Sequence, residues 1–241
     1  RDHGPVKLPP CDEAAYFYIY ARHQAEEKQR FEATLQGGQY GNRISGFARV
    51  PLVHEEDMDI IFDADHQPME TILNKIRLLE TASGRCYYAF FINPWSKYEQ
   101  DRQKHKVYSR VKEALLLRNI MMQNMDAAKL MKNGLRFFMP NLSAAFTGKL
   151  GGIPWRLKRP HTRELIVGFG VFQSKKYNMK YTGSSVCFSN DGTFEAFDCF
   201  RADDTYVLTA TVKKAIHKYV ATHENPERLV IHFYRRLSHK V

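Results

Sequence analysis

Four residues between positions 108 and 149 have the types and spacing to hold a phosphate group. Tyr108 and Lys112 are four positions apart, Gln123 follows eleven positions later, and Lys149 stands directly before a Leu-Gly-Gly segment. Proteins that bind phosphate without a dedicated metal cage use lysines for charge, an amide for direction and backbone N–H groups at glycine-rich turns. The two glycines could let the backbone approach a ligand, or could simply end a helix before a proline. As ordinary residues, the four would be a half-buried aromatic, two surface lysines and a polar cap.

The positive charge of the chain is concentrated around these residues. The net charge of +10 divides into −5 for residues 1–84 (9 Lys+Arg against 14 Asp+Glu), +12 for 85–163 (16 against 4) and +3 for 164–241 (11 against 8). A basic segment of this kind is either a solvated face or an electrostatic footprint for a polyanion. We expect nucleic acid or another phosphate ligand. Further cations that could contact a nucleic-acid backbone are Lys104, Lys106, Arg110, Arg156, Lys158 and Arg159.

The cysteines and the apolar segments exclude several classes of protein. The four cysteines, at positions 11, 86, 187 and 199, form no C-x-x-C pair, so neither a zinc ribbon nor a disulfide framework is indicated. No apolar run approaches the roughly 20 residues of a membrane span, and the first residues do not form a signal peptide. We therefore expect a cytoplasmic protein with reduced thiols and no membrane partner. Because the chain opens without Met, we expect a fragment or a processed product.

The apolar periodicity predicts the elements that position the four residues. Val107, Val111 and Leu115 repeat at four-residue steps, which predicts a helix over 104–119 with Tyr108 and Lys112 one turn apart. A buried strand is expected before this helix, and further helical segments are expected after it. These elements are the strand at 86–93 and the helical segments at 127–134 and 142–149. Alternating strands and helices predict a small α/β domain with a parallel sheet.

The remaining segments are predicted from the same signals. The acidic first 84 residues contain an aromatic strand at 16–20 and a helix at 69–80, and we place a domain boundary after them, where the charge changes sign. After residue 164 the chain reads as long apolar strands, and Asn190-Asp191-Gly192 is a strong hairpin signal. Three antiparallel strands, a helix and a returning strand predict the first part of a ribonuclease-H-like domain. The strands are expected at 165–172, 185–189, 193–200 and 230–234, with a helix at 212–221.

Together these motifs resemble the Argonaute family, most closely its short prokaryotic branch. The MID domain of that family holds the 5′-phosphorylated end of a guide strand with a Tyr-x-x-x-Lys pair, a glutamine about ten residues on, and the lysine of a K-L-G-G segment. The resemblance implies that Tyr108 stacks on the first base, while Lys112, Gln123 and Lys149 hold the phosphate. It also implies a Mg²⁺ ion at this phosphate, assisted by Gln123 and, in the family, by a C-terminal carboxylate that this chain ends too early to supply.

The resemblance covers residues 85–241 and implies a domain order. We expect residues 1–84 to be an acidic N-terminal region of unassigned role. Residues 85–163 should form a small Rossmann-like MID domain that binds the guide 5′ end. Residues 164–241 should form the first part of a PIWI domain, which is ribonuclease-H-like and incomplete here. The fold class is therefore α/β.

The same resemblance argues against catalysis by this chain. Slicing members hold two divalent ions with carboxylates, the first in a G-x-D strand and the second in an R-D-G turn. Here Gly170 and Arg236 stand at those positions. The neighbouring carboxylates are explained more simply by hairpin and loop roles. These carboxylates are Asp191, Glu195, Asp198, Asp203 and Asp204. The alternatives are a metal-dependent ribonuclease-H-like nuclease that cuts guide-paired targets, and a nonspecific nucleic-acid-binding protein.

Inactive PIWI domains behind a MID domain are typical of short prokaryotic Argonautes. The resemblance therefore implies a guide-loaded sensor of complementary strands that acts in defence against phages and plasmids. Its partner would be a separate effector subunit, either an NAD-degrading enzyme or a nuclease. Guide and target can each be RNA or DNA, because the 2′-hydroxyl contacts that decide this are not readable from residue types.

Overall fold

The structure of the chain is a computed structural model. It describes residues 4–36, 43–95, 99, 101–132, 135–158, 162–172, 182–201, 205–222 and 227–233. The chain divides into two compact units on either side of the bond between Trp155 and Arg156. In the described part of the chain, no helix is long and apolar enough to cross a membrane.

The first unit is built on a five-stranded sheet in which all pairs are parallel. Its strands are β1 (Ala14–Ala21), β2 (Leu52–His54), β3 (Ile60–Phe62), β4 (Cys86–Asn93) and β5 (Ile120–Asp126). The order is β2-β1-β4-β5, and β3 also pairs with β1. Strands β1 and β4 are almost continuously apolar and buried, as expected for central strands covered on both faces.

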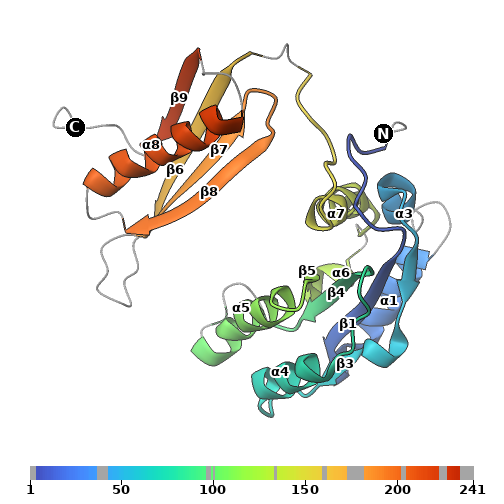
Figure 1. Cartoon of the computed structure of the whole chain (residues 1–241). Coiled ribbons are helices and arrows are strands. Elements are labelled where there is room, and N and C mark those ends of the chain that lie inside the picture. The colour runs from blue at the N-terminus through green and yellow to red at the C-terminus, as the bar shows by residue number, and fades with distance from the viewer. Residues whose placement is uncertain are drawn as a thin grey trace. The chain divides into compact units, whose positions relative to one another are not determined.

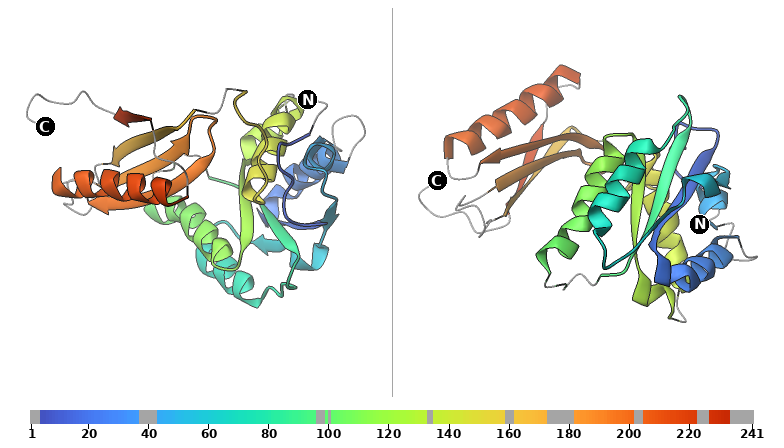
Figure 2. Two further views of the ribbon diagram at one scale, coloured as in Figure 1. Left: turned by 45° about the horizontal axis from the view of Figure 1, so that its top comes forward. Right: turned by 90° about the horizontal axis from the view of Figure 1, so that it is seen from below.

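Helices cover both faces of this sheet (Figures 1 and 2). Helices α4 (Pro68–Leu78) and α5 (Arg102–Leu116) pack on one face through residues such as Ile72 and Val111. In the described part of the chain, the opposite face packs against four helices, which contribute residues such as Phe31 and Phe146. These helices are α1 (Ala25–Gln36), α3 (Arg43–Ala48), α6 (Ala127–Leu130) and α7 (Leu135–Lys149). The alternation of side chains along the strands thus divides the core into two layers.

The structure corrects the predicted boundary at residue 84. Strands β1, β2 and β3 come from the acidic first part, yet they share one sheet with β4 and β5, and β1 pairs with β4 over seven residues. The unit instead ends at Trp155. Surface charge changes sign at residue 84, but the pairing of buried strands decides which segments form one core. Segment 120–126, to which the sequence analysis assigned no structure, forms strand β5.

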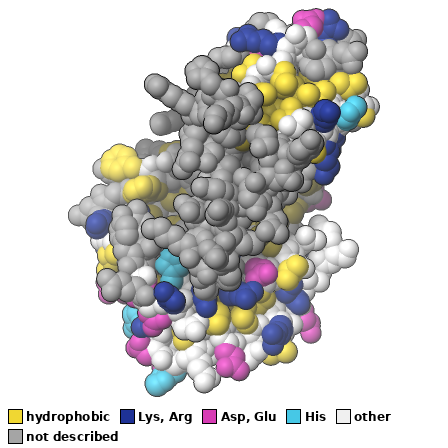
Figure 3. Space-filling view, turned by 90° about the vertical axis from the view of Figure 1, so that its left-hand side faces the viewer, with side chains coloured by type: hydrophobic (Ala, Val, Ile, Leu, Met, Phe, Trp, Pro, Cys, Tyr) yellow, Lys and Arg dark blue, Asp and Glu magenta, His cyan; other side chains and the backbone are white. Residues whose placement is uncertain are grey.

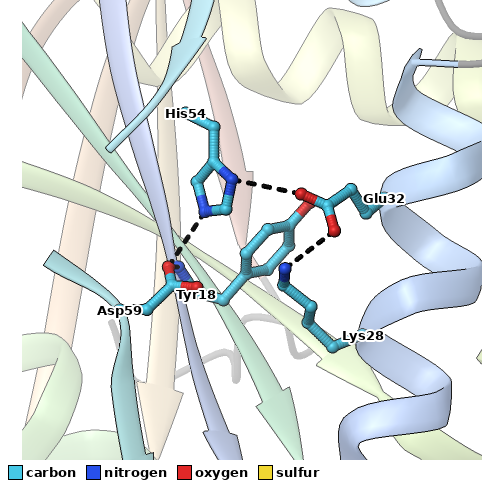
Figure 4. A network of polar contacts seen from close by, with 5 residues as sticks. All are labelled: Tyr18, Lys28, Glu32, His54 and Asp59. Atoms are coloured by element: carbon cyan, nitrogen blue, oxygen red, sulfur yellow. Dashed lines mark hydrogen bonds and ion pairs between the residues drawn. The ribbon is translucent and has the colours of Figure 1, made fainter. Parts of the chain in front are cut away.

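A network of polar side chains lies beside β1, in the interval between its two partner strands β2 and β3 (Figure 4). Tyr18 N–H donates to Asp59 Oδ1 at 2.7 Å, in the interval between the parts of β1 that pair with β2 and β3. The His54 ring lies between two carboxylates, with Nε2 3.1 Å from Asp59 Oδ1 and Nδ1 3.1 Å from Glu32 Oε1. Lys28 Nζ in turn contacts Glu32 Oε2 at 2.7 Å. Side-chain groups thereby replace a missing strand-to-strand hydrogen bond.

The second unit contains a four-stranded mixed sheet of order β8-β7-β6-β9. Its elements are β6 (Glu164–Phe172), β7 (Thr182–Ser189), β8 (Phe194–Arg201), α8 (Thr205–Thr222) and β9 (Arg228–Phe233). The pairs β6/β7 and β7/β8 are antiparallel, and β9 returns parallel to β6. Gly192 has a φ of +86° in the turn between β7 and β8, and Asp191 Oδ1 accepts from Thr193 N–H at 2.8 Å. The predicted hairpin and the predicted α/β fold class are confirmed.

Candidate phosphate and nucleic-acid site

The candidate site lies along β5, the last strand of the first unit's sheet in the described part of the chain. Helix α5 begins at the N-cap Asp101, whose side chain accepts from the N–H groups of Gln103 at 2.8 Å and Lys104 at 3.4 Å. Burial of one apolar face of α5 leaves Tyr108 37% exposed and Lys112 exposed. Gln123 lies on β5, and Lys149 is the last residue of α7. Three different elements thus contribute to the site.

Lys149 makes the contacts that define the site. Its Nζ donates to the backbone carbonyl of Met122 at 2.7 Å and to Gln123 Oε1 at 2.7 Å, and lies 5.9 Å from the centre of the Tyr88 ring. An ammonium has three hydrogens, so these two hydrogen bonds leave one donor for a further acceptor. The predicted proximity of Gln123 and Lys149 is therefore present, although the residues are 26 positions apart.

The charge of Lys112 affects the protonation of Lys149. Burial of the Lys149 ammonium lowers its pKa, and the positive charge of Lys112 lowers it further, although the residue as a whole retains an exposed surface. Lys112 and Lys149 are thus close enough to repel one another, and none of the four predicted residues is a carboxylate. Such a site favours an anion. A bound phosphate would remove the repulsion between them.

A cavity of about 990 Å³ lies at the carboxyl ends of β4 and β5, and Lys112 and Lys149 are not among the described residues that line it. Tyr108 and Gln123 line it, together with Lys104. The rest of its lining was not identified from the sequence, because it comes from segments that the motif does not include. Among these residues are Asn93, Trp95, His105, Asn124, Asp126 and Phe138. Polar groups from α5 and β5 thus face apolar groups from α7, as is typical of sites for aromatic, hydrogen-bonding ligands.

The other predicted cations are distributed over both units. Lys104 and Arg110 on α5 contact Asp65 at 3.4 Å and Glu113 at 2.9 Å, and Lys106 on the same helix is exposed. In the second unit, Arg156 contacts Asp191 at 3.8 Å and Lys158 is exposed, whereas Arg159 lies outside the described residues. Figure 3, which looks onto the side of the molecule where α5 lies in Figure 1, shows Lys and Arg side chains among hydrophobic and acidic ones. Exposed ion pairs of this kind are weak, so the paired cations can exchange partners.

The double glycine after Lys149 ends helix α7. Gly151 has a φ of +87°, Gly151 N–H donates to Gly148 O at 3.1 Å, and Gly152 N–H donates to Thr147 O at 2.9 Å. This arrangement is a glycine C-cap, in which the left-handed residue satisfies the last carbonyls of the helix. The glycines therefore fix the end of the helix that carries Lys149.

The two positions at which the sequence predicts a lost carboxylate are Gly170 and Arg236. Gly170 lies on β6 opposite Ser184 of β7, and Arg236 lies outside the described residues. Among the described residues, no group of three or more His, Cys, Asp or Glu could hold a metal ion. The four residues of the phosphate site also fit a magnesium ion poorly, because two are cationic and Gln123 Oε1 already accepts from Lys149.

No protein-family model matches the chain, and no curated protein matches it by sequence. Solved structures do match. Drosophila Piwi has a TM-score of 0.70 at 15% identity, over 97% of this chain and 30% of its own. Marinitoga piezophila Argonaute, in complex with a 5′-OH guide RNA, has a TM-score of 0.64 at 15% identity, over 98% of this chain and 37% of its own. Methanocaldococcus jannaschii Argonaute, in complex with guide DNA, has a TM-score of 0.63 at 13% identity, over 98% and 33%. The chain spans about a third of the length of these proteins, and within that span it has the fold of Argonaute and Piwi proteins, as its motifs predicted.

Proposed function

We propose that this chain is part of an Argonaute-family protein and binds the 5′ end of a guide strand at β5. The observation that carries the proposal is the contact of Lys149 with Gln123, with Lys112 close enough to lower the pKa of Lys149, beside a cavity that Gln123 and Tyr108 line. The fold shared with Argonaute structures that contain guide RNA or guide DNA supports it.

Each of the four residues has a distinct role in this proposal. Lys112 and Lys149 supply positive charge to the terminal phosphate, and the Gln123 amide supplies a directional hydrogen bond. Tyr108, which is 37% exposed and lines the cavity, offers a ring face on which the first base can stack. No metal is required for these contacts, because the two ammonium groups already neutralise much of the charge of a phosphate monoester.

We propose further that the protein senses targets without cutting them. Gly170 offers no carboxylate at the position where slicing members carry their first aspartate, and a single lost ligand weakens a two-metal site. By resemblance to short prokaryotic Argonautes, the loaded protein would recognise a complementary strand of a phage or plasmid. It would then act through an effector subunit, either an NAD-degrading enzyme or a nuclease.

The first experiment compares the affinities of matched oligonucleotides that differ only at the 5′ end. We expect tighter binding of the 5′-phosphorylated strand than of the 5′-hydroxyl strand, with RNA and DNA each tested in both forms. The comparison is needed because one neighbour of the same fold was solved with a 5′-OH guide. Equal affinity for both ends would contradict the phosphate site and favour nonspecific backbone binding. Preference for the hydroxyl end would also contradict it.

The second experiment uses the full-length protein with its guide and a labelled complementary target. We expect the target to remain intact in Mg²⁺ or Mn²⁺. Guide-directed cuts at a fixed position that persist after repurification, and that vanish when Asp198 or Asp203 is replaced, would establish the nuclease alternative. The double variant Gly170→Asp, Arg236→Asp should stay inactive, because the groups that orient metal ligands would still be missing.

A further inference from the structure

Residues 4–10, named here the N-terminal strap, pair through Lys7 with the chain just after α7. Lys7 N–H donates to Ile153 O at 3.1 Å, and Ile153 N–H donates to Lys7 O at 2.8 Å. Pro9 is buried in this contact region. The strap thus pairs with Ile153, only four positions after Lys149, although Lys7 itself precedes Lys149 by 142 positions (149 − 7).

The double glycine is what allows the strap to come so close. A Cβ at Gly152 would lie 2.8 Å from Lys7 O, 2.8 Å from Thr147 Cγ2 and 3.0 Å from Pro9 N, distances at which atoms must move. A Cβ at Gly151 would lie 3.3 Å from Pro10 Cδ. The same two residues make the hydrogen bonds that cap α7. The cap of the helix that carries Lys149 is therefore packed directly against the strap.

Two further contacts hold the strap's continuation to the sheet. The Cys11 thiol lies close enough to Cys86, at the start of β4, that burial and this neighbour together raise the pKa of Cys11, and both residues pack against the core layer that includes α7. Glu13 Oε1 accepts from Arg85 Nη2 at 2.6 Å. The strap is thus anchored at one end to the sheet and at the other to the turn after α7.

We propose that the N-terminal strap positions Lys149 for phosphate binding, so that releasing the strap weakens recognition of the 5′-phosphate specifically. This inference rests on the proposed function. The physical reason is that Lys149 is the last residue of α7, so the direction of its side chain depends on the capped turn. A loosened cap would let Nζ leave Met122 O and Gln123 Oε1, the two acceptors that now orient it.

Two pairs of variants test the proposal. Gly152→Ala introduces the clash with the strap, and Gly46→Ala is its matched control, because a Cβ at Gly46 meets nothing within 4 Å. Lys7→Pro removes the N–H that donates to Ile153 O, whereas Lys7→Ala keeps the backbone and removes only the side-chain charge. If Gly152→Ala fails to fold, the comparison of Lys7→Pro with Lys7→Ala still tests the proposal.

The readout is the ratio of affinities for 5′-phosphorylated and 5′-hydroxyl strands, with strap release measured by hydrogen exchange in residues 5–12. We expect Gly152→Ala and Lys7→Pro to lower this ratio by about threefold to tenfold, as for the loss of one oriented hydrogen bond, while both controls keep it. An unchanged ratio in variants whose strap is demonstrably released would overturn the inference.

A second readout separates this inference from the proposed function. The pKa of Lys149, followed through the ¹³C resonance of its ε carbon without any nucleic acid, should move towards the ordinary lysine value when the strap is released. If the wild-type protein does not distinguish the two 5′ ends, the proposed function fails, and this titration still decides whether the strap positions Lys149. A Lys149 titration that is identical in Lys7→Pro and Lys7→Ala, with the strap released in the former, would refute it.

Discussion

Replacing Gln123 with Glu would test the phosphate site with almost no change of shape. Gln123 Oε1 accepts a hydrogen bond from Lys149 Nζ at 2.7 Å, and a glutamate oxygen can accept the same bond. The fold should therefore persist and gain the roughly 0.2–1 kcal/mol of a partly exposed ion pair. The new carboxylate would pair with Lys149, so that only Lys112 would remain as a lysine without an anionic neighbour among the four residues.

The magnitude follows from the added charge. Unit charges about 5 Å apart interact by roughly 1.7 kcal/mol at an effective dielectric constant of about 40. A phosphate monoester carries about −1.5 to −2 at pH 7, and salt screening reduces the repulsion, so we expect a loss of about 1.5–3 kcal/mol. The affinity for a 5′-phosphorylated strand should thus fall by roughly 10- to 150-fold.

The assay is equilibrium binding of 5′-phosphorylated and 5′-hydroxyl strands to wild type, Gln123→Glu and Gln29→Glu. The last variant adds the same charge at an exposed position on α1, away from β5, and controls for the change in net charge. Affinity for the 5′-hydroxyl strand should change little in either variant. Equal losses for both strands, or a loss in Gln29→Glu as large as in Gln123→Glu, would refute the assignment of the phosphate to this site.

Three further predictions concern titration and stability. Burial and a neighbouring lysine lower the pKa of Lys149, and a bound phosphate should raise this pKa again. The affinity for phosphate should therefore fall as the pH rises through the lowered pKa. Calorimetry in buffers of different ionisation enthalpy should detect the proton that is taken up on binding. Burial and the hydrogen bond with Cys86 raise the pKa of the Cys11 thiol to about 12. Iodoacetamide at pH 8 should therefore label Cys11 in the native protein on the order of a thousandfold more slowly than after unfolding, and rapid native labelling would contradict this. Asp59→Ala leaves Tyr18 N–H without its acceptor and should cost about 1–3 kcal/mol in urea unfolding, more than Asp59→Asn, which keeps an oxygen there.

The elements with a strong apolar pattern could be predicted from the sequence, and those that depend on pairing could not. Segment 86–93 is apolar up to its last residue, Asn93, and forms β4, and the periodicity of Val107 and Val111 predicted α5. In contrast, β5 mixes methionine with polar residues, and its strand conformation comes from pairing with β4, where Gln123 lies opposite Phe90. Local composition carries no information about that partner.

The candidate site was predictable as a set of residue types but not as a set of contacts. Spacing places Tyr108 and Lys112 on one helix face whatever surrounds them. The hydrogen bond from Lys149 to Met122 O depends on β5 being the outer strand of the sheet, which only the strand order reveals. The closing of α7 by the double glycine followed from a general rule, whereas the strap that packs on it comes from the other end of the unit.

The hydrogen bond from Lys149 to Met122 O has a consequence for the outer strand of the sheet. Strand β5 ends the sheet in the described part of the chain, and an outer strand offers unpaired backbone groups to any other extended chain. A charged side chain that binds one of these carbonyls obstructs such pairing and raises the cost of bringing two copies together edge to edge. Lys149 therefore occupies one of the carbonyls that an added strand would use. An apolar residue at this position would leave this carbonyl without its hydrogen-bond donor as well as impair an anion site.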